Sequence, residues 1–153
     1  YTEGWALYVE FLSFDYAAQL FQERQQEQDA LLVQIEKHNR SMQLCLYSML
    51  DIMIHYDGAS YSQIAQVLEG FGVTDSDSAK AVYTYIIQSP CNYLKYYLGY
   101  LEIQSLQEKA VRLWGDEYTD LQFHRFLLDN GPADFTALTR LLEKSAPSPR
   151  KGN

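Results

Sequence analysis

The sequence predicts an all-α protein of about seven helices. Apolar residues recur at helical spacing between Gly and Pro residues, and no segment shows the sustained apolar–polar alternation of a β-strand. A chain of 153 residues matches one ordinary domain and is long enough to bury a core. We therefore expect a single helical domain over residues 1–144 and a disordered tail over residues 145–153.

The first two predicted helices are long. One runs from Thr2 to about Glu27 and carries apolar residues on nearly every face, which predicts burial on several sides. The segment QERQQEQDA is polar all round and indicates a solvated helix end or a turn. The other helix runs from about Asp29 to Tyr56, because apolar residues recur along it near helical spacing.

Two shorter helices follow. Gly58 closes the second helix, and Ser60 is placed to cap SYSQIAQVLEGFG, which stops at the glycines of residues 70–72. Asp75 or Ser76 then begins the helix DSAKAVYTYIIQS.

Three further helices complete the predicted domain. Pro90 suits the first turn of a long helix that Gly115 ends. Thr119 and Gln122 form a predicted capping box for TDLQFHRFLLDN. A last helix is expected over residues 132–144 and opens on a proline.

Composition excludes some classes of function. The formal net charge is −8, whereas nucleic-acid binding requires clustered Lys and Arg, so no nucleic-acid partner is expected. No apolar run approaches the ~20 residues needed to span a bilayer. Cys45 and Cys91 are too few for a disulfide framework and have no metal-type spacing, so we expect two buried thiols.

Two glutamates in the opening stretch YTEGWALYVE are candidates for chemistry. Glu3 lies on a helix with several apolar faces, where a carboxylate is costly unless it is paired or binds a metal. Glu10 lies two turns further along on the same side, close enough to help form one acidic wall. The alternative is that Glu3 is solvated in the first turn, where the helix dipole favours a negative charge. The residues alone leave both interpretations open.

The three histidines are widely separated, and no His-x-x-x-His pair exists. The chain therefore lacks the two-histidine half of a helical zinc site. His55 follows Asp51 by four residues, so Asp51 can hold its imidazole across one helical turn. An ordinary capping histidine at a helix end is the alternative. His124 is interpreted as a packing residue and His38 as a solvated one.

The sequence contains thirteen tyrosines, several of them in NYLKYYLGYLEI. Gly99 lies in the middle of the predicted helix, where glycine destabilises the helix by about 1 kcal/mol relative to alanine. A glycine at such a position is expected where another backbone or a ligand comes close to the helix. Such an aromatic stripe usually packs in a core. The functional alternative is a phenol directed into a cleft as an oxyanion donor.

Three stretches, in this order, resemble one bacterial family. They are EGWALYVE, DIMIHYDGASYSQIAQVL, and SPCNYLKYYLGYLEIQSLQEKA followed by LWGDEYTDLQFHRFLLDNGPADF. The family is the one known as domain of unknown function 885, whose members are predicted zinc metallopeptidases. From Glu3 to about Leu142 the chain is similar to the C-terminal half of such proteins, in a version associated with Gram-positive bacteria. The resemblance therefore implies that the helical domain over residues 1–144 is a partial one. It departs from the family at Ala59, where a tryptophan is common, and at Tyr97, where a lysine is common.

The resemblance implies an all-helical zinc peptidase whose His-Glu-x-x-His helix lies upstream of the Glu-Gly-Trp segment. Glu3 matches the glutamate of that segment and would be the third protein ligand of the zinc. Tyr96 and His55 match family positions, and we expect them to donate hydrogen bonds to the oxyanion of the tetrahedral intermediate. We expect Glu10 to orient a ligand histidine, and Asp51 to hold His55.

The resemblance also implies partners. The upstream half of the same polypeptide would carry the zinc helix, and a peptide would be the substrate. We expect this chain alone to hold no zinc and to be inactive. Proteins of this type are often exported or lipid-anchored. The competing interpretation is a non-catalytic helical interaction module, in which Glu3 is solvated and the tyrosines only pack.

A partial domain is expected to expose apolar surface that its other half covers. Trp5, Leu7 and Phe11 are the residues predicted to form this patch, and we expect self-association through it.

Overall fold

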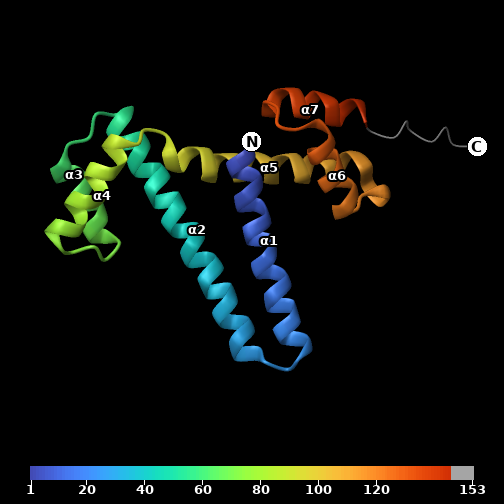
Figure 1. Cartoon of the computed structure of the whole chain (residues 1–153), viewed down its shortest axis with the longest axis horizontal. Helices are drawn as coiled ribbons and strands as arrows, with labels where there is room; N and C mark the ends of the chain where they lie inside the picture. Colours follow the sequence, from blue (N-terminus) through green and yellow to red (C-terminus); the bar gives the residue numbers. More distant parts are fainter. Residues whose placement is uncertain (146–153) are drawn as a thin grey trace, which may run out of the picture.

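The computed structural model describes residues 1–145, and all regular structure in that range is helical (Figure 1). The predicted all-α class with seven helices is confirmed. The elements are α1 (Thr2–Glu23), α2 (Glu27–His55), α3 (Tyr61–Gly70), α4 (Ser76–Gln88), α5 (Asn92–Trp114), the 3₁₀ turn η1 (Gly115–Glu117), α6 (Asp120–Asn130) and α7 (Phe135–Lys144).

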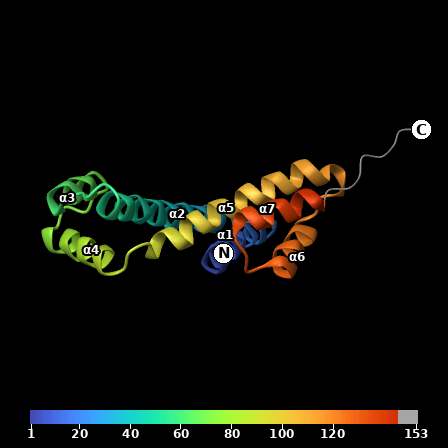
Figure 2. The same ribbon diagram turned by 90° about the horizontal axis from the view of Figure 1, so that it is seen from above.

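The long helices α1, α2 and α5 form the frame of the molecule. α1 and α2 form an antiparallel hairpin, and α5 crosses the end of the hairpin opposite its connecting turn (Figure 1). α3 and α4 pack near the C-terminal end of α2, where α5 begins. α6 and α7 pack at the far end of α5, so the two ends of α5 carry separate groups of short helices (Figure 2).

Side-chain caps begin several helices where the sequence predicts them. Ser60 and Gln63 form the capping box of α3. Asp75 begins α4 and accepts a hydrogen bond from a backbone N–H three residues on, at 2.8 Å. At α6, the Thr119 hydroxyl accepts a hydrogen bond from the Gln122 N–H at 3.1 Å, which is one of the two bonds of the predicted capping box. Each cap satisfies a backbone donor that the first helical turn leaves unpaired.

Both helices predicted to open on a proline begin later than expected. The residue before α5, Cys91, has a left-handed φ of 60°, so the helix starts after it rather than at Pro90. The residue before α7, Asp134, has an extended backbone, and its carboxylate accepts a hydrogen bond from a backbone N–H at 2.9 Å. This cap places the start of α7 three residues after Pro132.

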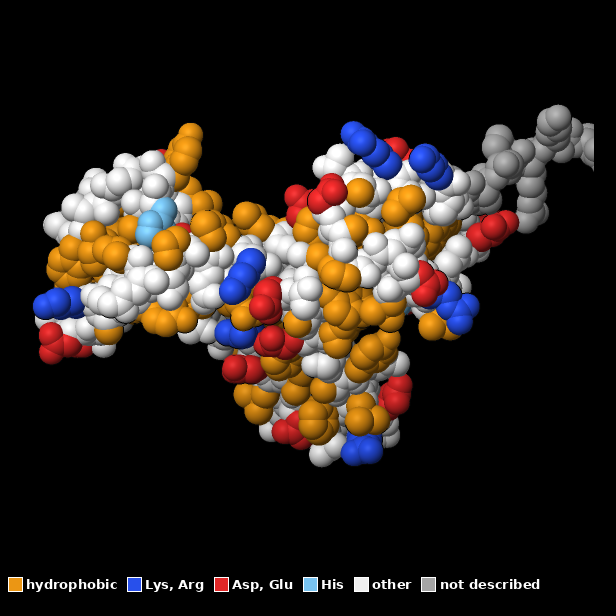
Figure 3. All heavy atoms as spheres, turned by 45° about the horizontal axis from the view of Figure 1, so that its top comes forward, with side chains coloured by type: hydrophobic (Ala, Val, Ile, Leu, Met, Phe, Trp, Pro, Cys, Tyr) orange, Lys and Arg blue, Asp and Glu red, His pale blue; other side chains and the backbone are white. Residues whose placement is uncertain are grey.

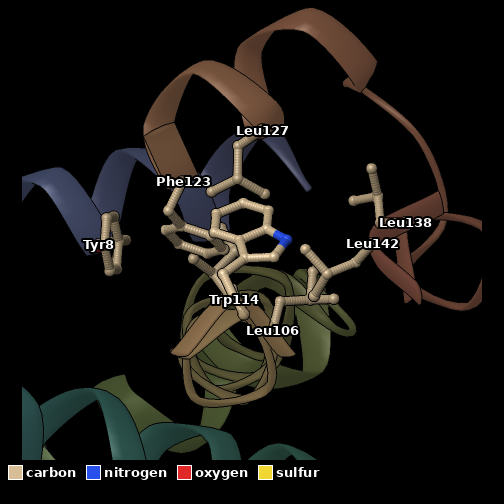
Figure 4. Packing of buried hydrophobic residues seen from close by; sticks show 9 residues of the cluster. Tyr8, Leu106, Trp114, Phe123, Leu127, Leu138 and Leu142 are labelled. Atoms are coloured by element: carbon tan, nitrogen blue, oxygen red, sulfur yellow. The ribbon is translucent and has the colours of Figure 1, made fainter. Parts of the chain in front are cut away.

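Three clusters of buried side chains make up the core of the described chain. The largest surrounds Trp114, where α1 and α5 meet α6 and α7 (Figure 4): Tyr8, Ile103, Leu106, Ala110, Trp114, Phe123, Leu127, Leu138 and Leu142. The second packs α2 against α3 and α4: Leu50, Ile64, Leu68, Ala79 and Ile86. The third joins α1 to α2: Leu7, Phe11 and Leu44.

The burial of α1 corrects two predictions. α1 buries one stripe rather than several faces: Gly4, Leu7, Tyr8, Phe11 and Ala18. Apolar residues on its other faces are exposed: Val9, Tyr16 and Leu20. The predicted exposed patch is also wrong, because Leu7 and Phe11 are only 1% and 3% exposed and Trp5 stacks on Tyr8. Apolar composition alone does not tell which face of a helix meets a neighbour.

The two thiols are free and exposed, so the prediction that both are buried is wrong. Cys45 lies on the outer side of α2, and Cys91 lies in the turn before α5. Both positions face away from the three clusters, and free cysteine is more often buried than these two are.

The described chain ends just after α7. Ser145 accepts a hydrogen bond from the Trp114 indole at 3.3 Å and donates one to the Leu142 carbonyl at 2.7 Å. The first residue of the predicted disordered tail is therefore ordered, and residues 146–153 lie outside the described residues. Within residues 1–145, none of the helices combines the length and apolar character that crossing a membrane requires.

Candidate functional site

The first turn of α1 crosses α5 so closely that the backbones of the two helices are in contact. Gly4 and Gly99 are both buried at this crossing. A Cβ on Gly4 would lie 2.2 Å from the carbonyl carbon of Gly99, and a Cβ on Gly99 would lie 2.9 Å from the Gly4 Cα. Glycine is therefore required for the approach. The close approach predicted at Gly99 is confirmed, and its partner is another backbone.

Glu3 lies directly beside this crossing. It is half-buried in the first turn of α1, and its side chain makes no hydrogen bond or ion pair with any of residues 1–145. Since successive helical residues are about 100° apart, Glu3 and Trp5 flank Gly4 on opposite sides. Trp5 meets His124 of α6 edge-on, so α6 covers the side of α1 opposite Glu3. A half-buried carboxylate without a partner is available to a cation.

Tyr96 lies one helical turn before Gly99 on α5. Its half-buried ring packs against the α1–α2 cluster of Leu7, Phe11 and Leu44. The Nζ of the adjacent Lys95 is 5.5 Å from the ring centroid. The hydroxyl makes no hydrogen bond within the described part of the chain. The fold thus brings Glu3 and Tyr96 to the same helix crossing from positions far apart in the sequence.

Asp51 and His55 form a junction between three helices. One carboxylate oxygen of the buried Asp51 accepts a hydrogen bond from the Cys91 N–H at 3.1 Å, at the start of α5. The His55 Nε2 is 3.1 Å from the Ile86 carbonyl oxygen of α4 and 3.7 Å from the same Asp51 oxygen. Because a carbonyl only accepts, Nε2 carries the proton. The pair therefore ties α2 to the end of α4 and to the start of α5.

This junction is separated from the Gly4–Gly99 crossing. Cys91 precedes Gly99 by eight residues, and a rise of ~1.5 Å per residue places ~12 Å of α5 between them. The sequence prediction put His55 and Tyr96 at one reaction centre. In the structure, Tyr96 lies one turn from the Gly4–Gly99 crossing and His55 lies beside Asp51, and their joint role in a reaction stays a prediction.

The remaining predicted site residue, Glu10, has a partner within the chain. Its carboxylate accepts a hydrogen bond from the Arg40 Nε at 3.0 Å, which links α1 to α2. Glu10 lies seven residues from Glu3, or ~10 Å along α1. Its contact with α2 does not require a ligand histidine, and the orienting role implied by the resemblance stays a prediction.

An aromatic cluster around His124 is a feature that sequence reasoning did not find. The Tyr8 hydroxyl is 3.1 Å from the His124 Nε2, and the rings of Trp5 and Tyr8 stack at 5.6 Å. His124 meets both rings edge-on at 5.7 Å, and burial raises the pKa of Tyr8 above its ordinary value. Trp5 and Tyr8 are three residues apart on one helix, which indicates a shared face but not its partner. The predicted packing role of His124 is confirmed, with a hydrogen bond in addition.

The described residues contain at most one ligand of a catalytic zinc site near the helix crossing. Within residues 1–145 no three His, Cys, Asp or Glu side chains gather closely enough to hold a metal ion. A catalytic zinc site takes three protein ligands, and the unpaired Glu3 carboxylate is of the type that can be one of them.

A comparison with known protein families identifies the family of this chain. A family model described as bacterial protein of unknown function (DUF885) matches residues 1–142. The chain belongs to the DUF885 family. Neither a curated protein nor a solved structure matches it significantly.

The DUF885 match covers the helix crossing, the three-helix junction and the aromatic cluster together. All of α1 to α6 and most of α7 lie within it. The membership predicted from the sequence is confirmed. The family's description assigns no activity, so any function of this DUF885 chain has to follow from the chemistry of its own side chains.

Proposed function

We propose that this chain supplies a glutamate ligand and a hydrogen-bond donor to the active site of a zinc-dependent peptidase. The α1–α5 crossing carries the proposal, because it holds an unpaired, half-buried Glu3 and places Tyr96 one turn from Gly99. A His-Glu-x-x-His helix from the upstream half of the same polypeptide would supply the two remaining zinc ligands.

The two side chains would have different tasks. Zinc, when bound, lowers the pKa of a bound water toward ~7 and polarises the carbonyl of a peptide. Glu3 would hold the ion through its carboxylate, which is the ligand type that accompanies two histidines in many zinc peptidases. The Tyr96 hydroxyl would donate a hydrogen bond to the substrate carbonyl oxygen as negative charge develops on it.

Asp51 and His55 would act on this site through α5. Their hydrogen bonds end on the backbone of Cys91 and Ile86, so they fix where α5 starts. The direction of α5 in turn sets where Tyr96 lies relative to Glu3. We therefore propose that both residues position α5.

The test uses the polypeptide that carries this chain together with the zinc helix. Glu3→Gln should lower bound zinc, measured by atomic emission, and abolish peptide hydrolysis. Tyr96→Phe should keep the zinc and lower kcat by roughly 10²–10³-fold, the effect of losing one oxyanion donor. Glu23→Gln is the matched control, since Glu23 is an exposed glutamate at the far end of the same helix. Wild-type zinc and activity in Glu3→Gln would overturn the proposal.

The second candidate function is a non-catalytic interaction module. The observation that favours it is the row of exposed apolar side chains along α2, which includes Leu31, Ile35 and Met42. The two candidates are separated by the sequence upstream of the Glu-Gly-Trp segment, which must contain His-Glu-x-x-His if the peptidase proposal is right. Without that motif, the interaction module is the better account.

A further inference from the structure

The outer face of α2 carries apolar residues with a seven-residue period. Two sets recur every seven residues and are exposed throughout: Ile35, Met42, Met49 and the C-cap residue Tyr56, and Leu31, His38, Cys45 and Ile52, of which His38 is the polar member. They occupy the a and d positions of successive heptads. We call these eight residues the α2 stripe.

A heptad stripe of this kind is suited to a helical partner. Apolar a and d positions keep one seam of a helix against another helix over many turns. The exposed fractions are large, for example 64% for Leu31 and 59% for Met42. A contiguous row of exposed apolar side chains is typical of a protein–protein contact, in which each partner of a stable complex buries about 800 Å².

The two halves of the stripe differ in shape. Around Cys45 and Met49, apolar grooves run along both sides. One, of about 150 Å³, is closed by Phe71, and the other, of about 330 Å³, is closed by residues of α5: Leu94, Tyr97, Leu98 and Leu101. Leu31 and Ile35 instead lie on the part of the α1–α2 hairpin that projects away from the other helices (Figure 1). Hydrophobic side chains are visible over this projecting part (Figure 3).

Over most of its length the stripe is flanked by uncharged residues, and Asp57 is the acidic residue that lines the larger groove at its end. The e and g positions between residues 32 and 53 hold only uncharged side chains: Leu32, Gln34, Asn39, Ser41, Leu46, Ser48 and Met53. In coiled coils these positions normally select partners through charge. With a net charge of −8 on the chain, like-charge repulsion would oppose self-association, and the e and g positions between residues 32 and 53 add nothing to that repulsion.

We propose that two copies of the chain associate through the α2 stripe with their α2 helices antiparallel. In this arrangement the projecting half of each stripe, with Leu31 and Ile35, enters the grooved half of its partner. A two-fold axis perpendicular to α2 relates the two copies. The two contacts are then identical, and the assembly stops at a dimer. A parallel pair would place projecting half against projecting half and leave the grooves empty. This proposal does not depend on the zinc site.

Sedimentation equilibrium of the whole chain tests the association. The wild type should reach a dimer mass as concentration rises, and Met42→Glu should weaken the dimer at least ~100-fold, because two buried charges would meet near the axis. Ile35→Glu is a second variant at another exposed position, and circular dichroism checks that both fold. Leu128→Glu is the matched control, since this leucine is 60% exposed on α6, away from α2. A chain that stays monomeric, or equal weakening by the control, would overturn the proposal.

Cross-linking tests the geometry separately. The antiparallel pair brings the two copies of Cys45 to ~10 Å from each other, the usual distance between packed helices. A short bis-maleimide should therefore join two copies in the wild type and in Cys91→Ser, but not in Cys45→Ser. Dimers linked only through Cys91 would contradict the arrangement.

Discussion

Gly4 and Gly99 bring the backbones of α1 and α5 into direct contact, with no room for a side chain between them. This contact fixes the first turn of α1, and therefore Glu3, against the segment of α5 that carries Tyr96. The two residues of the proposed site are held by regular helices rather than by loops, which favours precise placement.

Alanine at either glycine should destabilise the fold. Gly4→Ala is expected to cost about 3 kcal/mol in the free energy of unfolding, because its Cβ would lie 2.2 Å from backbone. Gly99→Ala should cost about 1–2 kcal/mol, since the clash is milder and alanine regains helix propensity. Gly70→Ala, at the end of α3 with open space around it, should change stability by less than about 0.5 kcal/mol. Urea unfolding followed by circular dichroism checks all three, and equal effects at Gly4 and Gly70 would contradict the contact.

Removing the Asp51 carboxylate should loosen the start of α5. Asp51→Ala leaves the Cys91 N–H without its acceptor and removes the carboxylate 3.7 Å from the His55 Nε2, so we expect a loss of about 2–3 kcal/mol in stability. Hydrogen exchange should become faster in the first turn of α5 in particular. Asp57→Ala, an exposed aspartate two residues after His55, is the control and should leave both quantities unchanged. Exchange that is unaltered in Asp51→Ala would rule out the positioning role.

The hydrogen bond between Tyr8 and His124 should contribute measurably to stability. Tyr8→Phe keeps the ring contacts and removes the hydroxyl, so we expect a loss of about 1 kcal/mol. Tyr16→Phe on the same helix, where the tyrosine is 61% exposed, should be neutral. Thermal unfolding of the two variants compares them directly, and identical melting temperatures would show that the bond contributes nothing.

Stability should fall in alkaline solution because buried tyrosines resist ionisation. Burial raises the pKa of Tyr118 to about 12, and burial also raises the pKa of Tyr8 and Tyr100. Below the unfolded-state pKa of about 10, folded and unfolded chains hold the same phenolic protons, so this stability is fully present. Above it the unfolded chain loses protons that the folded chain keeps, so stability decreases as pH rises toward 12.

Urea unfolding between pH 8 and pH 11.5 measures this decrease, at most about 1.4 kcal/mol per pH unit for each shifted tyrosine. Tyr118→Phe should make the decrease shallower. Tyr16→Phe, at a tyrosine that is 61% exposed and lies outside the α2 stripe, should leave it unchanged. A free energy of unfolding that is constant over this range would show that the buried phenols ionise freely.

Local chemistry made much of the fold predictable, whereas contacts between distant residues were not. Ser60, Asp75 and Thr119 were predictable caps, because each acts on backbone a few residues away. The starts of α5 and α7 were misjudged because a proline permits a helix start without requiring one.

In the candidate site, too, local features were predictable and contacts between distant residues were not. A close backbone approach was predictable at Gly99, from the penalty of glycine in mid-helix, but its partner Gly4 was not. The pairing of Asp51 with His55 was predictable from their spacing along one helix, whereas their contacts with the backbones of α4 and α5 depend on tertiary packing. The exposed face of α2 was identified only when the faces buried by α1 and α5 were known.

The central claim is that Glu3 binds zinc, and anomalous diffraction at the zinc edge tests it most directly. The crystals would contain the polypeptide that carries both this chain and the His-Glu-x-x-His helix, grown with zinc. We predict an anomalous peak with a Glu3 carboxylate oxygen ~2.0–2.2 Å from it. A zinc ion bound elsewhere, with Glu3 turned toward solvent, would contradict the claim.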